Sequence, residues 1–332
     1  MVLSACAGLT SPQRSLSVVI PAFNEAHRLP PTLQASLNYL GLHRETSWEL
    51  IVVDDGSTDG TAELVRTRGL SERLRLLRSM ENRGKGAALA AGALAARGDL
   101  ILLMDADGAT GISNVRTLES ALILSEIDEM NMNDGDQVGA NGFDSDTDST
   151  TGSTSIGSTS KGSSVGASVG ASVGASVGVS VGASVGASVG SDYSIALGSR
   201  ASVLAARPWR RKLMGYVFSA LASASVKGIS DTQCGFKLLT RGAAASTLPY
   251  LRVDGWAYDV ELLYLAQRRG LGIVAVEVPW RDVDGSKIRW HTPISMLVDA
   301  ARVSTLYRLG VWRDDEVPVQ REASTSCFVE LT

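Results

Sequence analysis

Short apolar runs alternate with stretches of helical spacing over the first part of the chain, from residue 16 to about residue 124. The apolar runs have the length and composition of buried parallel strands and lie at 16–20, 49–53, 74–77 and 100–104. The stretches between them repeat apolar residues at helical intervals and lie at 31–40, 61–68 and 87–96. This alternation predicts an α/β fold with a doubly wound, mostly parallel sheet and flanking helices.

A polar motif follows the carboxyl end of each of these predicted strands, directly or within a few residues. The four motifs occupy residues 21–25, 54–57, 82–86 and 105–108. Ligands of doubly wound sheets bind at the carboxyl ends of the strands. We therefore expect these four loops to build the functional site.

The middle of the chain, residues 134–192, has a different composition. It is rich in Asp, Ser, Thr, Gly and Asn at first, and Ser-Val-Gly then recurs every four residues from Ser164 to Gly190. A repeat whose only large residue is valine cannot build a packed core. The segment is interpreted as a long, disordered, low-complexity insertion, with a small glycine-valine β-stack as the alternative.

Regular structure is expected to resume after the insertion. The predicted elements are a strand at 194–199, a helix at 256–269 and a strand at 272–278. Thr292 can cap a final helix that has Pro293 at its first position. The apolar residues of that helix fall on one stripe, with Arg302 and Arg308 nearby, and are Ile294, Leu297, Val298, Ala301, Leu306 and Leu309.

Length and charge narrow the function classes. A chain of 332 residues fits one large domain or two ordinary ones. Six aspartates and one lysine give 134–192 a charge of −5, so the rest of a chain of net charge −4 is close to neutral, which argues against a nucleic-acid-binding protein. Three widely separated cysteines exclude a disulfide framework, show no zinc spacing and favour a reducing compartment.

No segment has the roughly 20 apolar residues that a membrane span needs. The best apolar candidate, 213–226, is too short, and it follows a basic cluster formed by Arg207, Arg210, Arg211 and Lys212. Cations beside an apolar segment, together with the helix at 294–309, are compatible with contact at a membrane surface. The alternative is that both segments are core helices flanked by solvated arginines.

Two carboxylates flank one small residue in the motif after the strand at 100–104. Asp105 and Asp107 offer hard oxygen ligands, which Mg²⁺ and Mn²⁺ prefer. A divalent ion held there would bridge a diphosphate and neutralise the charge of a departing nucleotide. The same spacing occurs by chance in surface loops, but the position at a strand end favours the functional interpretation.

The remaining loops suit a nucleotide. Asp54 or Asp55 can accept a hydrogen bond from a base or ribose, although both also fit a strand-ending turn with Asp59 capping the next helix. The Gly-Lys-Gly loop at 84–86 precedes an Ala-rich helix, whose N-terminus favours an anion. That loop lacks the P-loop spacing and the third glycine of the dinucleotide fingerprint, which disfavours an ATPase or a dehydrogenase.

The amino-acid sequences of these motifs are distinctive. Those at the strand ends read Val-Ile-Pro-Ala-Phe-Asn-Glu (19–25), Val-Val-Asp-Asp-Gly-Ser-Thr-Asp (52–59), Asn-Arg-Gly-Lys-Gly (82–86) and Met-Asp-Ala-Asp-Gly (104–108). Later stretches read Gly-Ser-Arg (198–200), Asp-Thr-Gln-Cys-Gly-Phe-Lys (231–237) and Trp-Ala-Tyr-Asp-Val-Glu-Leu (256–262). The first set resembles family 2 glycosyltransferases, which have the GT-A fold. Both sets together resemble the dolichyl-phosphate β-glucosyltransferases, which move glucose from UDP-glucose to dolichyl phosphate.

The resemblance implies a role for each matching position. The residues that the resemblance implies for nucleotide-sugar binding are Pro21, Ala22, Glu25, Asp54, Asp55, Lys85 and Asp105. Asp105 and Asp107 would hold Mg²⁺ or Mn²⁺, with Asp107 as the main ligand. The acceptor phosphate would meet Arg200, Lys237, Ser286 and Lys287. Asp259 stands where many relatives carry a catalytic carboxylate.

A phosphate acceptor changes what the catalytic groups must do. A sugar hydroxyl needs a general base, whereas a phosphate monoester, with a second pKa of about 6, is already anionic at neutral pH. The remaining problem is the repulsion between two anions, which a metal and Arg/Lys clamps solve. We expect charge neutralisation by Asp105, Asp107 and Arg200 to dominate, with Asp259 orienting groups rather than acting as a base. Direct in-line attack would invert the anomeric carbon.

The resemblance also implies a place in the cell, namely N-glycan assembly at the cytosolic face of the endoplasmic reticulum membrane. Members usually carry an N-terminal membrane helix, which residues 1–15 do not predict. Either this sequence begins after such a helix, or the protein relies on peripheral binding. Another polyprenyl-phosphate glycosyltransferase, such as a GDP-mannose-dependent enzyme, is one alternative. A non-catalytic peripheral membrane protein on a GT-A scaffold is another.

The expected organisation has five parts. They are a disordered N-terminus (1–15), a nucleotide-sugar-binding half (16–133), the insertion (134–192), an acceptor-binding half with membrane-surface helices (193–313) and a C-terminal tail (314–332).

Overall fold

The computed structural model describes residues 14–44, 46–137, 181–182, 192, 194–200, 226–229, 231–283 and 292–331. Most of the predicted insertion lies outside the described residues. The same holds for the basic cluster at 207–212, for the apolar stretch up to residue 225, and for Ser286 and Lys287. The predictions made for these segments stay predictions.

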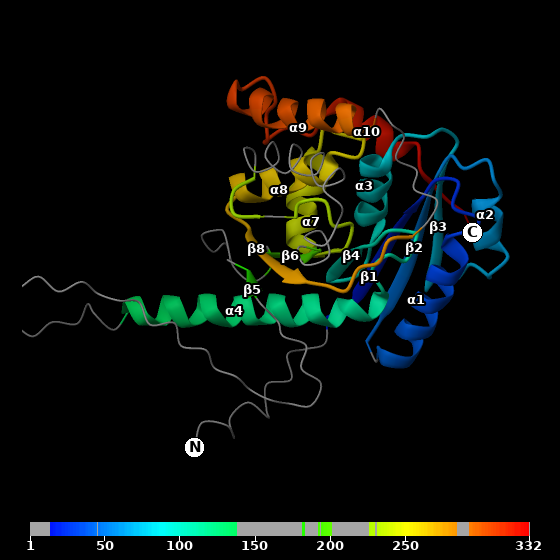
Figure 1. The fold of residues 1–332 in the computed structure, drawn as a ribbon, viewed down its shortest axis with the longest axis horizontal. Coiled ribbons are helices and arrows are strands. Elements are labelled where there is room, and N and C mark those ends of the chain that lie inside the picture. The colour runs from blue at the N-terminus through cyan, green and yellow to red at the C-terminus, as the bar shows by residue number, and fades with distance from the viewer. Residues whose placement is uncertain are drawn as a thin grey trace, which may run out of the picture.

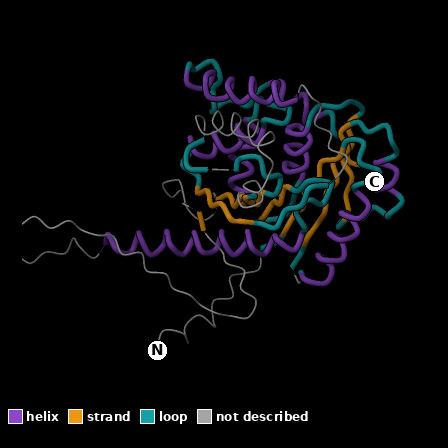
Figure 2. Tube along the Cα trace, in the orientation of Figure 1, coloured by secondary structure: helices purple, strands orange, loops and turns teal. Residues whose placement is uncertain are grey.

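A single sheet runs through the molecule, and its strands have the order β5-β8-β6-β7-β4-β1-β2-β3-β9 (Figures 1 and 2). The strands are β1 (Leu16–Ala22), β2 (Trp48–Asp55), β3 (Leu74–Ser79), β4 (Leu100–Leu103), β5 (Val181–Gly182), β6 (Ser194–Ser199), β7 (Lys237–Thr240), β8 (Gly272–Glu277) and β9 (Val329–Leu331). The neighbours β4, β1, β2 and β3 are parallel, as are β6 and β8, whereas β7, β9 and β5 pair antiparallel. The predicted α/β fold with a mostly parallel sheet is confirmed.

Helices cover both faces of this sheet (Figure 1). They are α1 (Leu29–His43), α2 (Thr61–Arg66), α3 (Lys85–Ala95), α4 (Val115–Gln137), α7 (Arg241–Thr247), α8 (Tyr258–Arg268), α9 (Thr292–Arg308) and α10 (Val319–Ser326), with short 3₁₀ turns at Ile112–Asn114 and Leu248–Tyr250. Because side chains alternate along a strand, β1 feeds two separate cores. Val19 packs with α3 and α8, whereas Val18 and Ile20 pack with α1 and α4.

Six of these helices and strands were not among the predicted elements, namely α4, α7, α10, β5, β7 and β9. Helix α4 was not predicted, and it continues through Gln137, past the expected start of the insertion at 134. The two-residue strand β5 comes from the Ser-Val-Gly repeat and pairs with β8. β9 was not predicted either, because a three-residue strand is too short to show a period and depends on its partner β3.

Helix α9 has the predicted bounds but a different buried face. Its core stripe consists of Met296, Ala300, Val303 and Tyr307, at intervals of three to four residues, and the helix packs on α8. Val298 and Leu309, which the sequence analysis placed on the apolar stripe, are exposed. Apolar residues occur around most of this helix, so the sequence pattern does not specify which stripe meets the core. Within the part of the chain that the structure describes, no helix has the length and hydropathy of a membrane span.

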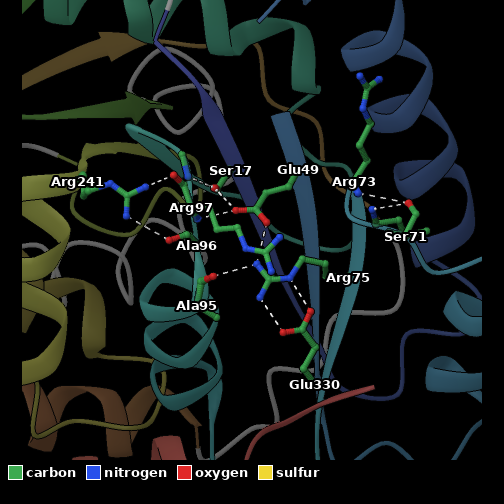
Figure 3. Close-up of polar contacts among 12 residues, drawn as sticks. Ser17, Glu49, Ser71, Arg73, Arg75, Ala95, Ala96, Arg97, Arg241 and Glu330 are labelled. Carbon is green, nitrogen blue, oxygen red and sulfur yellow. Dashed lines mark hydrogen bonds and ion pairs between the residues drawn. The ribbon is translucent and has the colours of Figure 1, made fainter. Parts of the chain in front are cut away.

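A buried polar network crosses the amino ends of the parallel strands, at the opposite edge from the predicted site (Figure 3). Glu49 accepts hydrogen bonds from the Ser17 hydroxyl at 2.6 Å, the Arg97 amide at 2.6 Å and the Arg75 guanidinium at 2.7 Å. Arg75 also forms a two-pronged ion pair with Glu330, the central residue of β9, at 2.6 and 2.8 Å. The network therefore fastens the C-terminus to the sheet.

Candidate active site

The carboxyl ends of β1, β2 and β4 meet at one edge of the sheet. Ala22 lies beside Asp54 in the parallel register of β1 and β2. The loops that follow are hydrogen-bonded together, since the Asn24 amide donates to the Ser57 hydroxyl at 2.9 Å and the Glu25 amide to the Thr61 hydroxyl at 2.9 Å. The predicted convergence of the first two motifs, which include Pro21, is thus observed.

The two aspartates that end β2 support neighbouring backbone. Asp54 is fully buried, accepts a hydrogen bond from the Ser57 amide at 3.1 Å and lies 3.1 Å from the Arg78 guanidinium. Asp55 accepts the amides of Arg83 and Gly84 at 2.7 and 2.8 Å, one on each oxygen. Burial raises the pKa of Asp55 to about 6, although both hydrogen bonds act to lower it. Asp55 therefore holds the glycine-rich loop in place.

That loop needs its glycines because other backbone lies against it. Gly84 has a φ of 102°, and a Cβ there would overlap the carbonyl oxygen of Asp254. A Cβ on Gly86 would lie 2.7 Å from the Cβ of Tyr258. Lys85, between them, is the first residue of α3 and carries its ammonium to Asp105 at 2.6 Å.

The carboxylate of Asp105 lies close to several cationic side chains. Burial acts to raise its pKa, but the hydrogen-bonded Lys85 and the nearby charges of Lys237 and Arg200 outweigh it, and the pKa lies below the usual value. Gly235 approaches Asp105 from the other side, so closely that a Cβ there would overlap the carboxylate. Asp105 is therefore ionised and fixed on both sides.

Asp107 has a different cation beside it. Its carboxylate accepts the Ala109 amide at 3.1 Å and lies 3.6 Å from the guanidinium of Arg28. Arg28 is held in turn by both oxygens of Glu25, with its Nε at 2.7 Å. The bond to Glu25 raises the pKa of Arg28, against the effect of burial.

Arg200, at the end of β6, is aligned by Asp231. The pair is two-pronged at 2.8 Å for both bonds, and the Arg200 amide adds a third bond at 2.9 Å. Burial acts to raise the pKa of Asp231, but the hydrogen bonds and charge of the Arg200 guanidinium outweigh it. The pKa of Asp231 therefore lies below its usual value. The Arg200 guanidinium also lies 5.6 Å from the centre of the Trp280 ring.

Lys237 and Asp259 form a buried ion pair. The ammonium of Lys237 lies 2.5 Å from Asp259 and also donates to the carbonyl of Cys234. Both side chains are nearly inaccessible to solvent, at 1% and 5%. Lys237, which the resemblance assigned to the acceptor phosphate, is therefore occupied by groups of the chain itself. Cys234 is buried, and burial raises the pKa of its thiol, consistent with a packed side chain.

A small recess joins the Asp105 and Arg200 sides of the site. Its lining residues come from both halves of the sheet and are Asp105, Ala109, Thr110, Arg200, Gly235, Phe236 and Trp280. The fold thus brings Asp105, which follows β4, and Arg200, which follows β6, to one recess. Residues widely separated in sequence face the same small volume.

The carboxylate pair fits a divalent ion. Within the described ranges, no group of three or more His, Cys, Asp or Glu side chains could hold a metal. Asp105 and Asp107 supply two hard oxygen donors, and Mg²⁺ commonly binds through one or two carboxylates plus substrate phosphates and water. The donor set therefore suits an ion that arrives with a diphosphate.

The sequence analysis missed several residues of this site, among them Arg28, Asp231, Gly235, Tyr258 and Trp280. Asp231 and Gly235 lie inside the quoted 231–237 motif, which could have drawn attention to them. Arg28 carries no such signal, because nothing in the local pattern connects it with Asp107.

Comparison with known proteins begins with a sequence family. The family described as Glycosyl transferase family 2 matches residues 17–113. A dolichyl-phosphate beta-glucosyltransferase of Dictyostelium discoideum is 32% identical over 312 residues, covering 90% of this chain and 76% of the relative. The enzymes of that name from Mus musculus and Homo sapiens are each 34% identical, covering 91% of this chain and 79% of the relative.

Solved structures share the fold. Glucosyl-3-phosphoglycerate synthase of Mycobacterium tuberculosis, in complex with UDP, superposes with a TM-score of 0.52 at 16% identity, covering 90% of this chain and 81% of that one. A complex of that synthase with Mn²⁺, UDP and phosphoglyceric acid gives a TM-score of 0.52 at 17% identity, with coverages of 90% and 79%.

Proposed function

Because the chain belongs to the dolichyl-phosphate β-glucosyltransferase family, we propose that it transfers glucose from UDP-glucose to dolichyl phosphate with inversion of the anomeric carbon. The chain is a glycosyltransferase of family 2. The observation that carries the specific proposal is similarity to these relatives over about nine-tenths of the chain, which includes the Arg200 side of the site as well as the nucleotide side. The product would serve N-glycan assembly.

On the donor side, the loops after β1 and β2 would bind uridine. Pro21, Ala22 and Glu25 border this proposed uridine site. Asp54 and Asp55 hold the neighbouring loops by accepting hydrogen bonds from their backbone amides. Lys85 then places a positive charge at the N-terminus of α3, where an anionic diphosphate is favoured.

Asp105 and Asp107 would hold Mg²⁺ or Mn²⁺, which would neutralise charge on the departing UDP. The structural neighbour that binds Mn²⁺ together with UDP supports this role. Lys85 lies 2.6 Å from Asp105 and Arg28 lies 3.6 Å from Asp107, so each carboxylate is oriented by a cation of the chain. The chain thus supplies a prearranged pair of anionic ligands.

On the acceptor side, Arg200 would bind the lipid phosphate and offset its charge. Asp231 holds the guanidinium in one orientation, which favours two-pronged recognition of a phosphate. No base is required, because the attacking oxygen is already anionic. Asp259, whose carboxylate is taken by Lys237, would orient the backbone near Cys234. Ser286 and Lys287 complete the proposed acceptor contacts.

The lipid acceptor requires a membrane surface, and α9 offers one candidate face. Val298 and Leu309 are exposed there, with Arg302 and Arg308 on the same helix and Val311 exposed just beyond it. Apolar side chains beside arginines suit an interface rich in anionic headgroups. We propose peripheral binding at the cytosolic face of the endoplasmic reticulum, with no nucleic-acid partner.

The test incubates the protein with dolichyl phosphate vesicles, Mn²⁺ or Mg²⁺, and labelled UDP-glucose or GDP-mannose in separate reactions. Lipid-extractable label from UDP-glucose alone supports the proposal, and label from GDP-mannose alone refutes it in favour of a mannosyl enzyme. Absence of transfer from either donor would favour a non-catalytic peripheral membrane protein. Asp107→Ala should abolish turnover, and retained activity would remove the proposed metal role.

A further inference from the structure

The last described segment of the chain contacts the nucleotide half at two places. We call this segment, which consists of α10 and β9 (319–331), the C-terminal strap. β9 pairs with β3 at the edge of the sheet, and α10 packs against α3 (Figure 1). Glu330 anchors the first contact through Arg75, on the far side from the site (Figure 3). Arg321 anchors the second, next to the glycine-rich loop.

Arg321 is a large, charged side chain that is almost fully buried, with 2% of its surface exposed. Its Nε donates to the carbonyl of Leu251 at 2.9 Å, its Nη2 donates to the carbonyl of Val253 at 3.3 Å, and the same nitrogen lies 2.8 Å from the Asp254 carboxylate. Ser324, one turn along α10, donates to that carboxylate at 3.3 Å. A buried guanidinium is tolerated only when it is paired in this way. These contacts therefore fix the loop at 251–255.

Glu261 of α8 holds the same loop from its other side. Its carboxylate accepts the amide of Arg252 at 2.8 Å, the amide of Val253 at 2.7 Å and the hydroxyl of Tyr307 at 2.8 Å. The carbonyls of the loop thus bond a buried cation while its amides bond a buried anion. This arrangement leaves the loop one favourable orientation.

The loop passes its position on to the donor side of the site. The carbonyl of Asp254 accepts the amide of Gly86 at 2.7 Å, and it lies where a side chain on Gly84 would have to be. Lys85 stands between these glycines. The chain that continues from the loop places the ring of Trp256 5.2 Å from the Lys85 ammonium. The backbone contacts of Gly84 and Gly86 therefore come from the loop that Arg321 fixes, and a ring contact of Lys85 comes from the residue that follows this loop.

We propose that Arg321 is a positioning residue for the donor site, acting through the loop at 251–255 on the N-terminus of α3 and on Lys85. The inference rests on the proposed use of UDP-glucose and adds to it a part of the chain remote in sequence. Coupling between two sites is reciprocal. UDP seated against the Lys85 loop must therefore also stabilise the contacts of Arg321.

The experiment compares Arg321→Gln and Arg321→Lys with Glu330→Gln, a matched change at the other anchor of the strap. UDP binding is measured by calorimetry, KM and kcat by glucosyl transfer, and stability by urea unfolding. We expect Arg321→Gln to weaken UDP binding and to raise KM for UDP-glucose by about tenfold, with little change in kcat. Arg321→Lys should recover part of the affinity because it keeps the charge. Glu330→Gln should lower stability with UDP affinity unchanged.

Equal UDP affinity in Arg321→Gln and wild type would overturn the inference, as would equal weakening by Glu330→Gln. If the Arg321 variants do not fold, hydrogen exchange of the wild-type protein decides. Added UDP should slow exchange at 321–326 as well as at 84–88, and unchanged exchange at 321–326 would refute the coupling. A wild-type protein that binds no UDP would overturn the proposed donor and this inference together, whereas UDP binding that ignores Arg321 would overturn this inference alone.

Discussion

Replacing Gly235 with alanine should disable the enzyme while leaving the fold intact. The backbone of Gly235 lies against the carboxylate of Asp105, and its φ is outside the left-handed region, so alanine suits the backbone itself. The added methyl group has no such freedom. It would lie 2.7 Å from one carboxylate oxygen of Asp105 and closer still to the rest of the group.

The size of the effect follows from this overlap. An ordinary contact is about 3.5 Å, so Asp105 or the backbone of Gly235 must move by about 1 Å. A misplacement of about 1 Å in a catalytic constellation costs on the order of 100-fold in rate, or about 2.7 kcal/mol of barrier. The same crowding should lower the free energy of unfolding by about 1–3 kcal/mol.

The assay measures initial rates of glucosyl-lipid formation at saturating dolichyl phosphate, with thermal unfolding recorded for each variant. Gly111→Ala is the matched control in the loop after Asp107, because the nearest atoms to its added methyl lie 3.8 Å away. We expect that control to work like wild type. A folded Gly235→Ala protein with a rate within about threefold of wild type would refute the claim that Asp105 must stay in place.

Three further predictions concern charge. Burial raises the pKa of Asp55 to about 6, and a protonated carboxyl cannot accept both loop amides, so UDP affinity should fall as pH drops through 6. Calorimetry between pH 5 and 8 measures this affinity, and Asp55→Asn should remove its change near pH 6. Arg28→Gln should tighten Mn²⁺ binding to the protein alone by about threefold to tenfold, because it removes a cation 3.6 Å from Asp107; unchanged binding by electron paramagnetic resonance would contradict this. Glu49→Gln should lower stability by about 1–3 kcal/mol in urea unfolding, because Arg75 and the Arg97 amide lose a charged acceptor while Glu330 still pairs with Arg75; the rate per folded molecule should stay constant.

Strands β1 to β4 and the motifs that follow them could be predicted from the sequence, because each is specified by residues that are neighbours along the chain. Each of β1 to β4 is a short apolar run that carries its own pattern, and each polar motif adjoins its strand in sequence. Parallel strands then bring these loops to one edge without further information. The convergence of the first two motifs, and of Lys85 with Asp105, needed no more than this.

Contacts between distant segments could not be read in this way. Arg28 beside Asp107, Lys237 against Asp259 and Arg321 against Asp254 are pairings of wholly or partly buried charge. A lysine or arginine in a sequence looks the same whether it meets a substrate, a carboxylate of the chain or water. Burial decides among these, and burial depends on what the whole fold packs around the side chain.

The amino-acid sequence by itself determined the parallel strands β1 to β4, the order of the motifs that follow them, the carboxylate pair and the family, since all of these depend on residues close to one another along the chain. Tertiary structure alone decided which cation neutralises which carboxylate and why position 235 must be glycine. It also decided that Arg321, near the C-terminus, contacts the loop at 251–255, which is hydrogen-bonded to Gly86. Those outcomes follow from close packing and from the cost of leaving a buried charge unpaired, two effects that act through space.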